Sequence, residues 1–230
     1  MVFEFCPFDL SHIIEDKTVV LNESIIKSYL RMLLLGCEAL HDVWVLHRDL
    51  KPSNLLLSPT GILKIADFGL ARVFGSPNRE MTSTVVTIFY RAPELLFGAK
   101  QYGPAVDIWS VGCIFAELMI RVPFFPGDGE IDQLGKIFHA LGTPTEEDWP
   151  GMSLLPSYMA FSPREPTPLS VNFPAASPAS LELLSWFLRF DPNKRPTAAQ
   201  ALQHAYFSAP GTIVAAPLDK LPKPLLRMTT

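Results

Sequence analysis

Two aspartates and an asparagine stand close together in the sequence, on either side of a short apolar stretch. Asp49 and Asn54 precede the apolar run Leu55–Leu57, and Asp67 follows the run Ile62–Ile65. Carboxylate and amide oxygens are ligands that suit Mg²⁺, and Mg²⁺ in turn binds phosphate groups. These side chains could therefore bind a metal ion and, through it, a phosphate group, provided that the two apolar runs bring them to the same edge of the structure.

A tight turn is predicted between the two apolar runs. The sequence Ser58-Pro59-Thr60-Gly61 combines a proline, which fixes one φ angle, with a glycine, which readily adopts a positive φ. The stretch therefore predicts a β-hairpin whose open end carries the polar residues. A helix over residues 22–41 is expected to lead into it, because Asn22 is a side-chain cap and apolar residues follow at helical spacing.

Helical spacing and caps predict further helices in the second half of the chain, over residues 107–119, 130–141, 177–190 and 197–206. The proline-rich segment 150–176 is expected to be irregular. Near the start, Val2–Phe5 alternates between apolar and polar residues and predicts a short strand. The tail from Ala209 shows no period, and we expect it to be a loose, solvated extension.

Composition narrows the possible functions. With 230 residues, 48% of them hydrophobic, the chain is long enough for one substantial domain or most of a larger one. A net charge of −4 offers no electrostatic case for direct nucleic-acid binding. Three widely spaced cysteines argue against a zinc site or disulfides and for a reducing compartment. The most apolar stretch, 108–125, contains Glu117 and Arg121, which favours a buried helix over a membrane span.

Three motifs follow one another in a fixed order. They are HRDLKPSN at 47–54, DFG at 67–69 and APE at 92–94, with a long Ser/Thr-bearing loop between the last two. This order matches the signature set of protein kinases. The sequence resembles the eukaryotic protein kinases and, among them, the cyclin-dependent kinases. The segments FGSPNR (74–79), RVPFFPGD (121–128) and LGTPTEEDWP (141–150) are most similar to the kinases that activate other cyclin-dependent kinases.

The resemblance covers residues 2–207 and implies an α+β, mainly α fold, the large C-terminal lobe of a protein kinase with short β-hairpins. It implies a kinase domain over 1–207, made of the hinge and this lobe, and a proline-rich tail over 208–230. No G-x-G-x-x-G motif and no strand lysine precedes residue 3. The small lobe is therefore expected to be absent, the sequence to be cut on its N-terminal side, and this chain alone to have little activity.

The resemblance also assigns roles to the polar residues around the hairpin. Asp49 matches the base that orients the substrate hydroxyl, and Lys51 matches the cation that steadies the transferring phosphate. Asn54 and Asp67 match two ligands of Mg²⁺. Thr87 matches the threonine that braces Asp49 and marks Ser/Thr specificity. For Asp49 and Asn54, the residues alone also allow a plain turn-capping role.

ATP is the implied phosphate donor, and residues 3–9 resemble the kinase hinge that binds its adenine. Backbone groups of Glu4 and Cys6 would contact the adenine, Asp9 would face the ribose, and Leu56 would form the apolar floor. Cys6 is also a candidate reactive thiol, although no basic residue stands beside it in the sequence.

The loop between DFG and APE carries two implied phosphorylation sites. Thr82 matches the activating phosphothreonine, with an ordinary loop threonine as the alternative, and Ser76 matches a second phosphosite. Arg48 and Arg72 resemble members of the cationic socket that receives a phosphate, which arginine can grip with two parallel hydrogen bonds.

Further positions match structural features of these kinases. Glu94 and Arg195 resemble a buried ion pair that anchors the loop, and Asp107 resembles a buried acid that holds the backbone of the HRD motif. A surface charge is the alternative for each of them. Residues 85–86 and Arg91 match the pocket that accepts a proline after the phosphorylated residue.

Two functions remain open at this point. The first is ATP-dependent phosphorylation of Ser or Thr, often followed by Pro, in proteins such as the RNA polymerase II C-terminal domain and the activation loops of cyclin-dependent kinases. The full-length parent would then bind a cyclin and an assembly subunit in the nucleus. The second is a truncated, non-catalytic interaction module that binds through residues 70–100 and 121–150. Neither implies contact with nucleic acid or a membrane.

Overall fold

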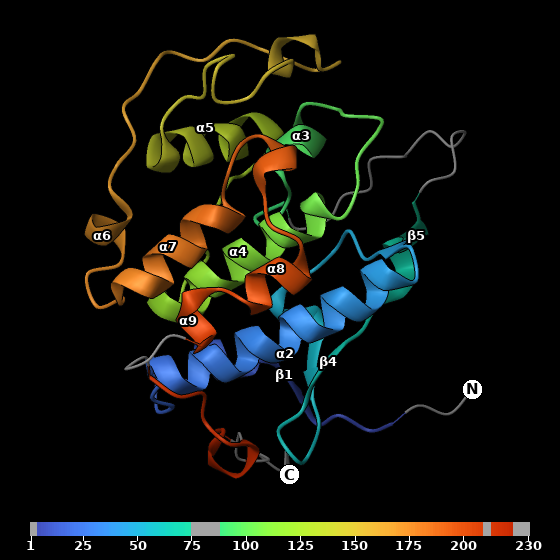
Figure 1. The fold of residues 1–230 in the computed structure, drawn as a ribbon, viewed down its shortest axis with the longest axis vertical. Coiled ribbons are helices and arrows are strands. Elements are labelled where there is room, and N and C mark those ends of the chain that lie inside the picture. Colours follow the sequence, from blue (N-terminus) through green and yellow to red (C-terminus); the bar gives the residue numbers. More distant parts are fainter. Residues whose placement is uncertain (1–3, 75–87, 209–212, 223–230) are drawn as a thin grey trace.

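A long apolar helix, α4 (Ala105–Ile120), occupies the middle of the fold. The computed structural model describes residues 4–74, 88–208 and 213–222. Figure 1 shows three helices around α4, namely α2 (Glu23–Asp42), α7 (Pro178–Phe187) and α8 (Ala198–Leu202). The side chains of α4 are buried on nearly every face, as expected of a helix that is apolar all round. The helix predicted over 107–119 is confirmed and begins two residues earlier.

Helix α2 confirms the helix predicted over 22–41. The side chain of Asn22 caps it, because Oδ1 accepts a hydrogen bond from the Ile25 N–H at 3.0 Å. The helix passes close to strand β4 (Leu63–Ile65). A Cβ atom on Gly36 would lie only 2.7 Å from Cδ1 of Ile65, so a glycine at this position permits the close approach.

The predicted hairpin is also confirmed. Strands β3 (Leu55–Leu57) and β4 pair antiparallel, with Leu55 opposite Ile65 and Leu57 opposite Leu63. At the turn, Gly61 has a φ of +88° and Ser58 N–H donates to Ile62 O at 2.9 Å. Strand β1 (Phe8–Asp9) pairs with the other side of β3 and completes a three-stranded sheet.

A second, two-stranded sheet was not predicted. It joins β2 (Val45–Leu46) to β5 (Arg72–Val73) in antiparallel register. These strands are too short to leave a periodic signal in the sequence, yet they place the segments before HRD and after DFG side by side.

Further helices and short 3₁₀ turns complete the described ranges. The α-helices are α1 (Leu10–Glu15), α3 (Pro93–Leu96), α5 (Glu130–Leu141), α6 (Leu169–Asn172) and α9 (Ala205–Ser208). Short 3₁₀ turns are η1 (Pro52–Asn54), η2 (Phe68–Leu70), η3 (Met152–Leu154), η4 (Pro192–Lys194) and η5 (Leu218–Lys220). Helix α5 has the predicted bounds. No helix in the described ranges is both long enough and apolar enough to cross a bilayer.

Three predictions about local structure were wrong. Glu4 and Phe5 do not form the predicted strand, whose first two residues lie outside the described ranges. The first strand of the described ranges is β1, which pairs with the edge of β3. Helix α7 ends at residue 187 instead of 190. The predicted helix over 197–206 is divided into α8 and α9, since the ring of His204 accepts the N–H of Tyr206 at 3.0 Å and interrupts the helical pattern.

The prediction of a loose, solvated tail was wrong for residues 213–222. Ala216 N–H donates to Ser24 O at 2.9 Å, and Leu221 is buried. The tail contacts α2 through its own main chain. Such contacts need no side-chain period, so the sequence pattern could not show them.

Candidate active site

Helix α4 holds the HRD segment in place through the side chain of Asp107. The carboxylate of Asp107, which is buried, accepts hydrogen bonds from His47 N–H at 2.9 Å and Arg48 N–H at 2.8 Å. His41 Nε2 adds a third contact to this carboxylate at 3.0 Å. Arg48 has a φ of +67°, a left-handed conformation that is unfavourable for a bulky residue. The two backbone hydrogen bonds to Asp107 therefore hold a strained turn in place.

Three of the predicted catalytic and metal-binding residues lie together above this turn. Lys51 Nζ lies 2.9 Å from Asp49 Oδ2. Asn54 Nδ2 donates to the same oxygen at 3.1 Å and to the Asp49 carbonyl at 2.8 Å. This cluster gathers a carboxylate, an ammonium and an amide at one point, and the Oδ1 atom of Asn54 takes no part in these contacts.

His47 connects this cluster to the turn that carries Asp67. Its Nδ1 accepts from Asp49 N–H at 3.3 Å, and its Nε2 donates to Ala66 O at 2.8 Å. The main chain makes a second link, since Ala66 N–H donates to Asn54 O at 2.9 Å. These contacts bring Asp67 to the same end of the hairpin as Asn54, as the hairpin prediction required.

Asp67 leaves part of its carboxylate available. The residue has a φ of +62°, and its Oδ1 accepts from Gly69 N–H at 3.2 Å. Within the described ranges, no group of three or more His, Cys, Asp or Glu side chains could bind a metal by itself. The oxygen donors of Asn54 and Asp67 suit Mg²⁺, and phosphate oxygens would have to complete its coordination.

The predicted nucleotide-binding residues lie on the β1 side of the sheet. Asp9 is opposite Leu56 in the pairing of β1 with β3, so the ribose and adenine-floor positions are neighbours. Oδ1 of Asp9 caps α1, accepting from Ser11 N–H at 2.9 Å, while Oδ2 has no such contact with the residues that the structure describes. Cys6 is half-buried, and the side chain of Glu4 forms an ion pair with a lysine of β4.

The second sheet places the strand that leads to Arg48 beside the strand that carries Arg72. Leu46, two residues before Arg48, is opposite Arg72 in the β2–β5 pairing. Arg48 donates to Leu70 O at 2.6 Å and to the Tyr102 hydroxyl at 2.8 Å. The Nη1 atom of Arg72 is buried without a hydrogen-bond partner in the part of the chain that the structure describes. An anion placed beside it would supply that partner.

Glu94 and Arg195 form a bidentate ion pair. The two guanidinium–carboxylate distances are 2.6 Å and 2.8 Å, and both side chains are buried. The guanidinium also donates to the carbonyls of Arg189 and Phe190 at 2.8 Å and 3.0 Å, and it lies 4.9 Å from the centre of the Trp109 ring. These two carbonyls belong to the segment that follows α7, which ends at Phe187.

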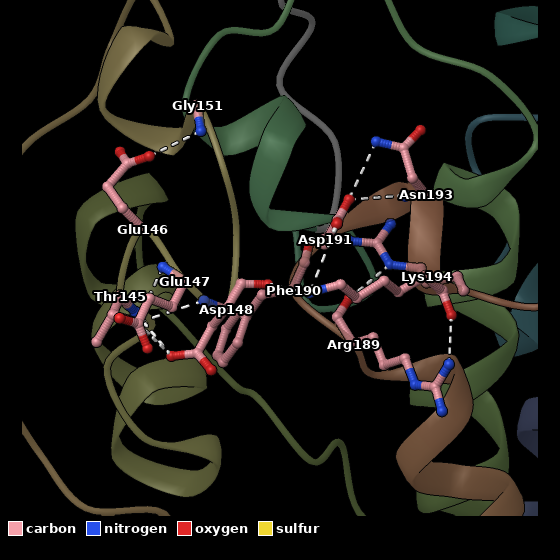
Figure 2. A network of polar contacts seen from close by, with 11 residues as sticks. Thr145, Glu146, Glu147, Asp148, Gly151, Arg189, Phe190, Asp191, Asn193 and Lys194 are labelled. Atoms are coloured by element: carbon pink, nitrogen blue, oxygen red, sulfur yellow. Dashed lines mark hydrogen bonds and ion pairs between the residues drawn. The ribbon is translucent and has the colours of Figure 1, made fainter.

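Short polar contacts shape the segment that leads to this arginine. Figure 2 shows Asp191 accepting from the Asn193 N–H, at 2.9 Å, and Arg189 donating to Lys194 O, at 2.7 Å. Lys194 also reaches the carbonyl of Asp148 at 3.3 Å. The segment is thus connected to the loop that follows α5.

The sequence did not predict two sets of buried hydrogen bonds, one made by Glu117 and one by Arg121. The Tyr90 hydroxyl donates to Glu117 at 2.7 Å inside the core. Burial raises the pKa of Glu117, although the hydrogen bond from Tyr90 opposes the shift. Arg121 closes the end of α1 by donating to the carbonyls of Ile13 and Ile14, at 2.9 Å and 3.0 Å. Glu117 and Arg121 are charged residues inside the apolar stretch 108–125, and a charge in such a stretch indicates that it has a buried polar partner.

Comparison with known proteins places the chain in a family. The protein-family model described as Protein kinase domain matches residues 1–207. This chain belongs to the protein kinase family. The kinase chain is 59% identical over 209 residues to Cyclin-dependent kinase 7 of Dictyostelium discoideum, covering 91% of this chain and 58% of that protein. It is 56% identical over 222 residues to Cyclin-dependent kinase 7 of Xenopus laevis, covering 94% and 63%.

A solved structure supports the same assignment for the fold. The kinase chain superposes on a chain from the CAK complex of Chaetomium thermophilum bound to ATP-gamma-S with a TM-score of 0.89 and 43% identity, covering 96% of this chain and 70% of that one. The mainly helical α+β kinase fold with small sheets is therefore confirmed. The kinase chain spans only about six-tenths of the length of the two curated relatives.

Several predicted site residues of the kinase chain lie outside the described ranges. They are the two phosphosites, Ser76 and Thr82, the bracing threonine, Thr87, and pocket residues 85–86. Arg91, the remaining pocket residue, forms an ion pair with Glu130 at 3.0 Å.

Proposed function

We propose that this chain carries the catalytic loop of a cyclin-dependent-type Ser/Thr protein kinase. Such an enzyme transfers the γ-phosphoryl group of ATP to a Ser or Thr hydroxyl of a protein. The observation that carries the proposal is the cluster of Asp49, Lys51 and Asn54 above a strained turn that Asp107 holds. Family membership supports it independently.

The cluster suggests how the residues would divide the chemistry. Asp49 would accept the proton of the attacking hydroxyl as its oxygen bonds to phosphorus and ADP departs. Lys51, 2.9 Å from the Asp49 carboxylate, would turn its ammonium toward the transferred phosphate, where negative charge is spread in the transition state. Asn54 and Asp67 would hold Mg²⁺, which neutralises phosphate charge when bound.

Roles in nucleotide binding and in regulation can be proposed for further residues. Oδ2 of Asp9 would accept from a ribose hydroxyl, Leu56, which is opposite Asp9 in the β1–β3 pairing, would lie beneath the adenine, and the backbone of Glu4 and Cys6 would contact its edge. Phosphorylated Thr82 or Ser76 would find a cationic partner in the buried Nη1 of Arg72.

Substrates and partners are proposed from the relatives. They bear the name Cyclin-dependent kinase 7, and the matching structure is of a CAK complex. Together with the resemblance of the sequence, these names support our proposal that the whole protein phosphorylates the RNA polymerase II C-terminal domain and the activation loops of cyclin-dependent kinases, binds a cyclin and an assembly subunit, and acts in the nucleus.

The non-catalytic module is the second candidate. Exposed apolar side chains favour it, because Val73 is 67% exposed in segment 70–100, and Val122 and Ile131 are 53% and 62% exposed in segment 121–150. Such residues can contribute to a protein interface.

An assay of the purified chain separates the two. Phosphate transfer from labelled ATP to a Ser-Pro peptide is measured for the parent chain, for Asp49→Asn, and for Asp42→Asn as an exposed control. We expect a small rate, because the 230 residues contain no G-x-G-x-x-G loop, and a loss of roughly 10²–10⁴-fold in Asp49→Asn only. Equal rates in all three folded proteins would refute the catalytic proposal, while substrate binding without transfer would favour the module.

A further inference from the structure

Residues 213–222, called the strap below, lie along the first turns of helix α2. The kinase-family match ends at residue 207, so the strap lies beyond it. Figure 1 shows this segment, in the reddest colours, running below the N-terminal half of α2. Ser24, Lys27 and Ser28 stand three and four residues apart, which places their side chains on one face of α2, toward the strap.

The strap is bound through its main chain. The hydrogen bonds are Ser24 Oγ to Val214 O at 2.5 Å, Ser28 Oγ to Ala216 O at 2.7 Å, Ala216 N to Ser24 O at 2.9 Å, and Lys27 Nζ to Ile213 O. Each pairs a polar side chain or carbonyl of α2 with a peptide group of the strap. This mode of binding places few demands on the strap's side chains, which fits a segment without an apolar period.

Lys27 shows that the strap completes the fold. Its side chain is only 1% exposed, and its ammonium lies 4.4 Å from the centre of the Tyr206 ring. Burial lowers the pKa of Lys27, while the nearby Glu23 acts in the opposite direction. A buried ammonium needs hydrogen-bond partners, and the Ile213 carbonyl supplies one.

The other end of the strap contacts the tip of the hairpin. Leu221 is 3% exposed, and a Cβ on Gly61 would lie 3.6 Å from its Cβ and 3.2 Å from Leu218 O. The strap therefore runs from α2 to the turn between β3 and β4. Strand β3 has three residues, so the tip lies about 10 Å from the end that carries Asn54 and Asp67.

We propose that the strap is a positioning element for the metal-binding end of the hairpin. It clamps the hairpin tip to α2, and α2 in turn packs along β4. With its tip fixed, the hairpin presents Asn54 and Asp67 in one orientation. The metal-binding part of this inference rests on the proposed function, whereas the clamping part rests on the contacts alone.

Two matched variants of the full chain test the proposal. Leu221→Asp places a charge at the buried contact, and Leu218→Asp makes the same change at a strap position that is 42% exposed. The readouts are amide hydrogen exchange at Gly61 and Ile62, and the affinity for Mg²⁺ with a non-hydrolysable ATP analogue. In Leu221→Asp we expect at least about tenfold faster exchange, equivalent to about 1.4 kcal/mol, and about tenfold weaker binding. Leu218→Asp should change neither by more than about twofold.

A second pair protects the test against a variant that fails to fold. Ser28→Ala removes one strap contact. Ser185→Ala removes a serine whose hydroxyl, among the described residues, bonds only within its own helix, to Glu182 O. Exchange at the hairpin tip should rise in Ser28→Ala alone. Unchanged exchange in both strap-contact variants would overturn the clamp, and faster exchange with unchanged affinity would overturn the positioning role. If exchange is faster in the strap-contact variants but the parent chain binds no nucleotide, the clamp is supported and the proposed function is refuted.

Discussion

Replacing Asp107 by asparagine tests whether helix α4 holds the HRD turn. The carboxylate accepts from His47 N–H at 2.9 Å and from Arg48 N–H at 2.8 Å, one on each oxygen. Asparagine has the same shape but exchanges one acceptor oxygen for an NH₂ donor. In either orientation of the amide, a donor then faces one of these backbone N–H groups.

The size of the effect follows from the two consequences of that exchange. Losing one hydrogen bond to a charged acceptor costs about 1.5–3 kcal/mol, and leaving a buried N–H unsatisfied costs about 1–3 kcal/mol. Arg48, at a φ of +67°, can relax once it is released and recover about 1–2 kcal/mol. We expect a net loss of about 3 kcal/mol in the free energy of unfolding. For a chain of this length, that lowers Tm by roughly 6–12 °C.

Urea and thermal unfolding, followed by circular dichroism, measure this loss. Asp42→Asn is the control, because Asp42 is exposed at the end of α2 and the same atoms are exchanged there. Its unfolding free energy should stay within about 0.5 kcal/mol of the parent value. If Asp107→Asn also stays within about 1 kcal/mol, the carboxylate does not hold the turn and the reasoning fails.

Three further predictions concern the core. Arg195→Lys should lower the free energy of unfolding by about 3–5 kcal/mol, since lysine cannot form the bidentate pair with its buried carboxylate; a loss below about 1 kcal/mol in urea unfolding would contradict this. Burial lowers the pKa of His204, and protonation of its Nδ1 would break the bond from Tyr206 N–H, so stability is full above pH 6.5 and falls as the pH drops below that value. His204→Asn should flatten the pH profile of Tm, and an unchanged slope would contradict the assignment. Gly112→Ala should cost about 1–3 kcal/mol, because its Cβ would come within 2.7 Å of an atom in α7, whereas Gly135→Ala, with open space around it, should stabilise the chain by about 0.4–1 kcal/mol; equal effects in thermal unfolding would refute the packing argument.

Much of the fold could be predicted because its signals are local. Asn22 caps α2, Thr197 and Gln200 form the capping box that begins α8, and Gly61 has the positive φ that the hairpin turn needs. Each of these acts within five residues of its own position, so the sequence displays cause and effect together. The same holds for Asp49 and Asn54, which are five residues apart and in direct contact.

Prediction failed where the deciding partner is far along the chain. The segment after α7 is held by Arg195, which binds the carbonyls of Arg189 and Phe190, and the tail packs because Ser24 and Lys27 bind its peptide groups. Arg121 closes α1 from more than a hundred residues away. Main-chain carbonyls are the same at every position, so a sequence does not indicate which of them a distant side chain will reach.

The sequence by itself determined the kinase family, the long helices, the hairpin and the set of residues that could handle Mg²⁺ and phosphate, since residue type and order carry that information. Only the tertiary structure decided that Asp107 holds a left-handed Arg48, that His47 links Asp49 to the turn of Asp67, and that the strap reaches the hairpin tip. The physical reason is that these contacts depend on distances between segments, which are set when the apolar faces of α2, α4 and α7 pack together.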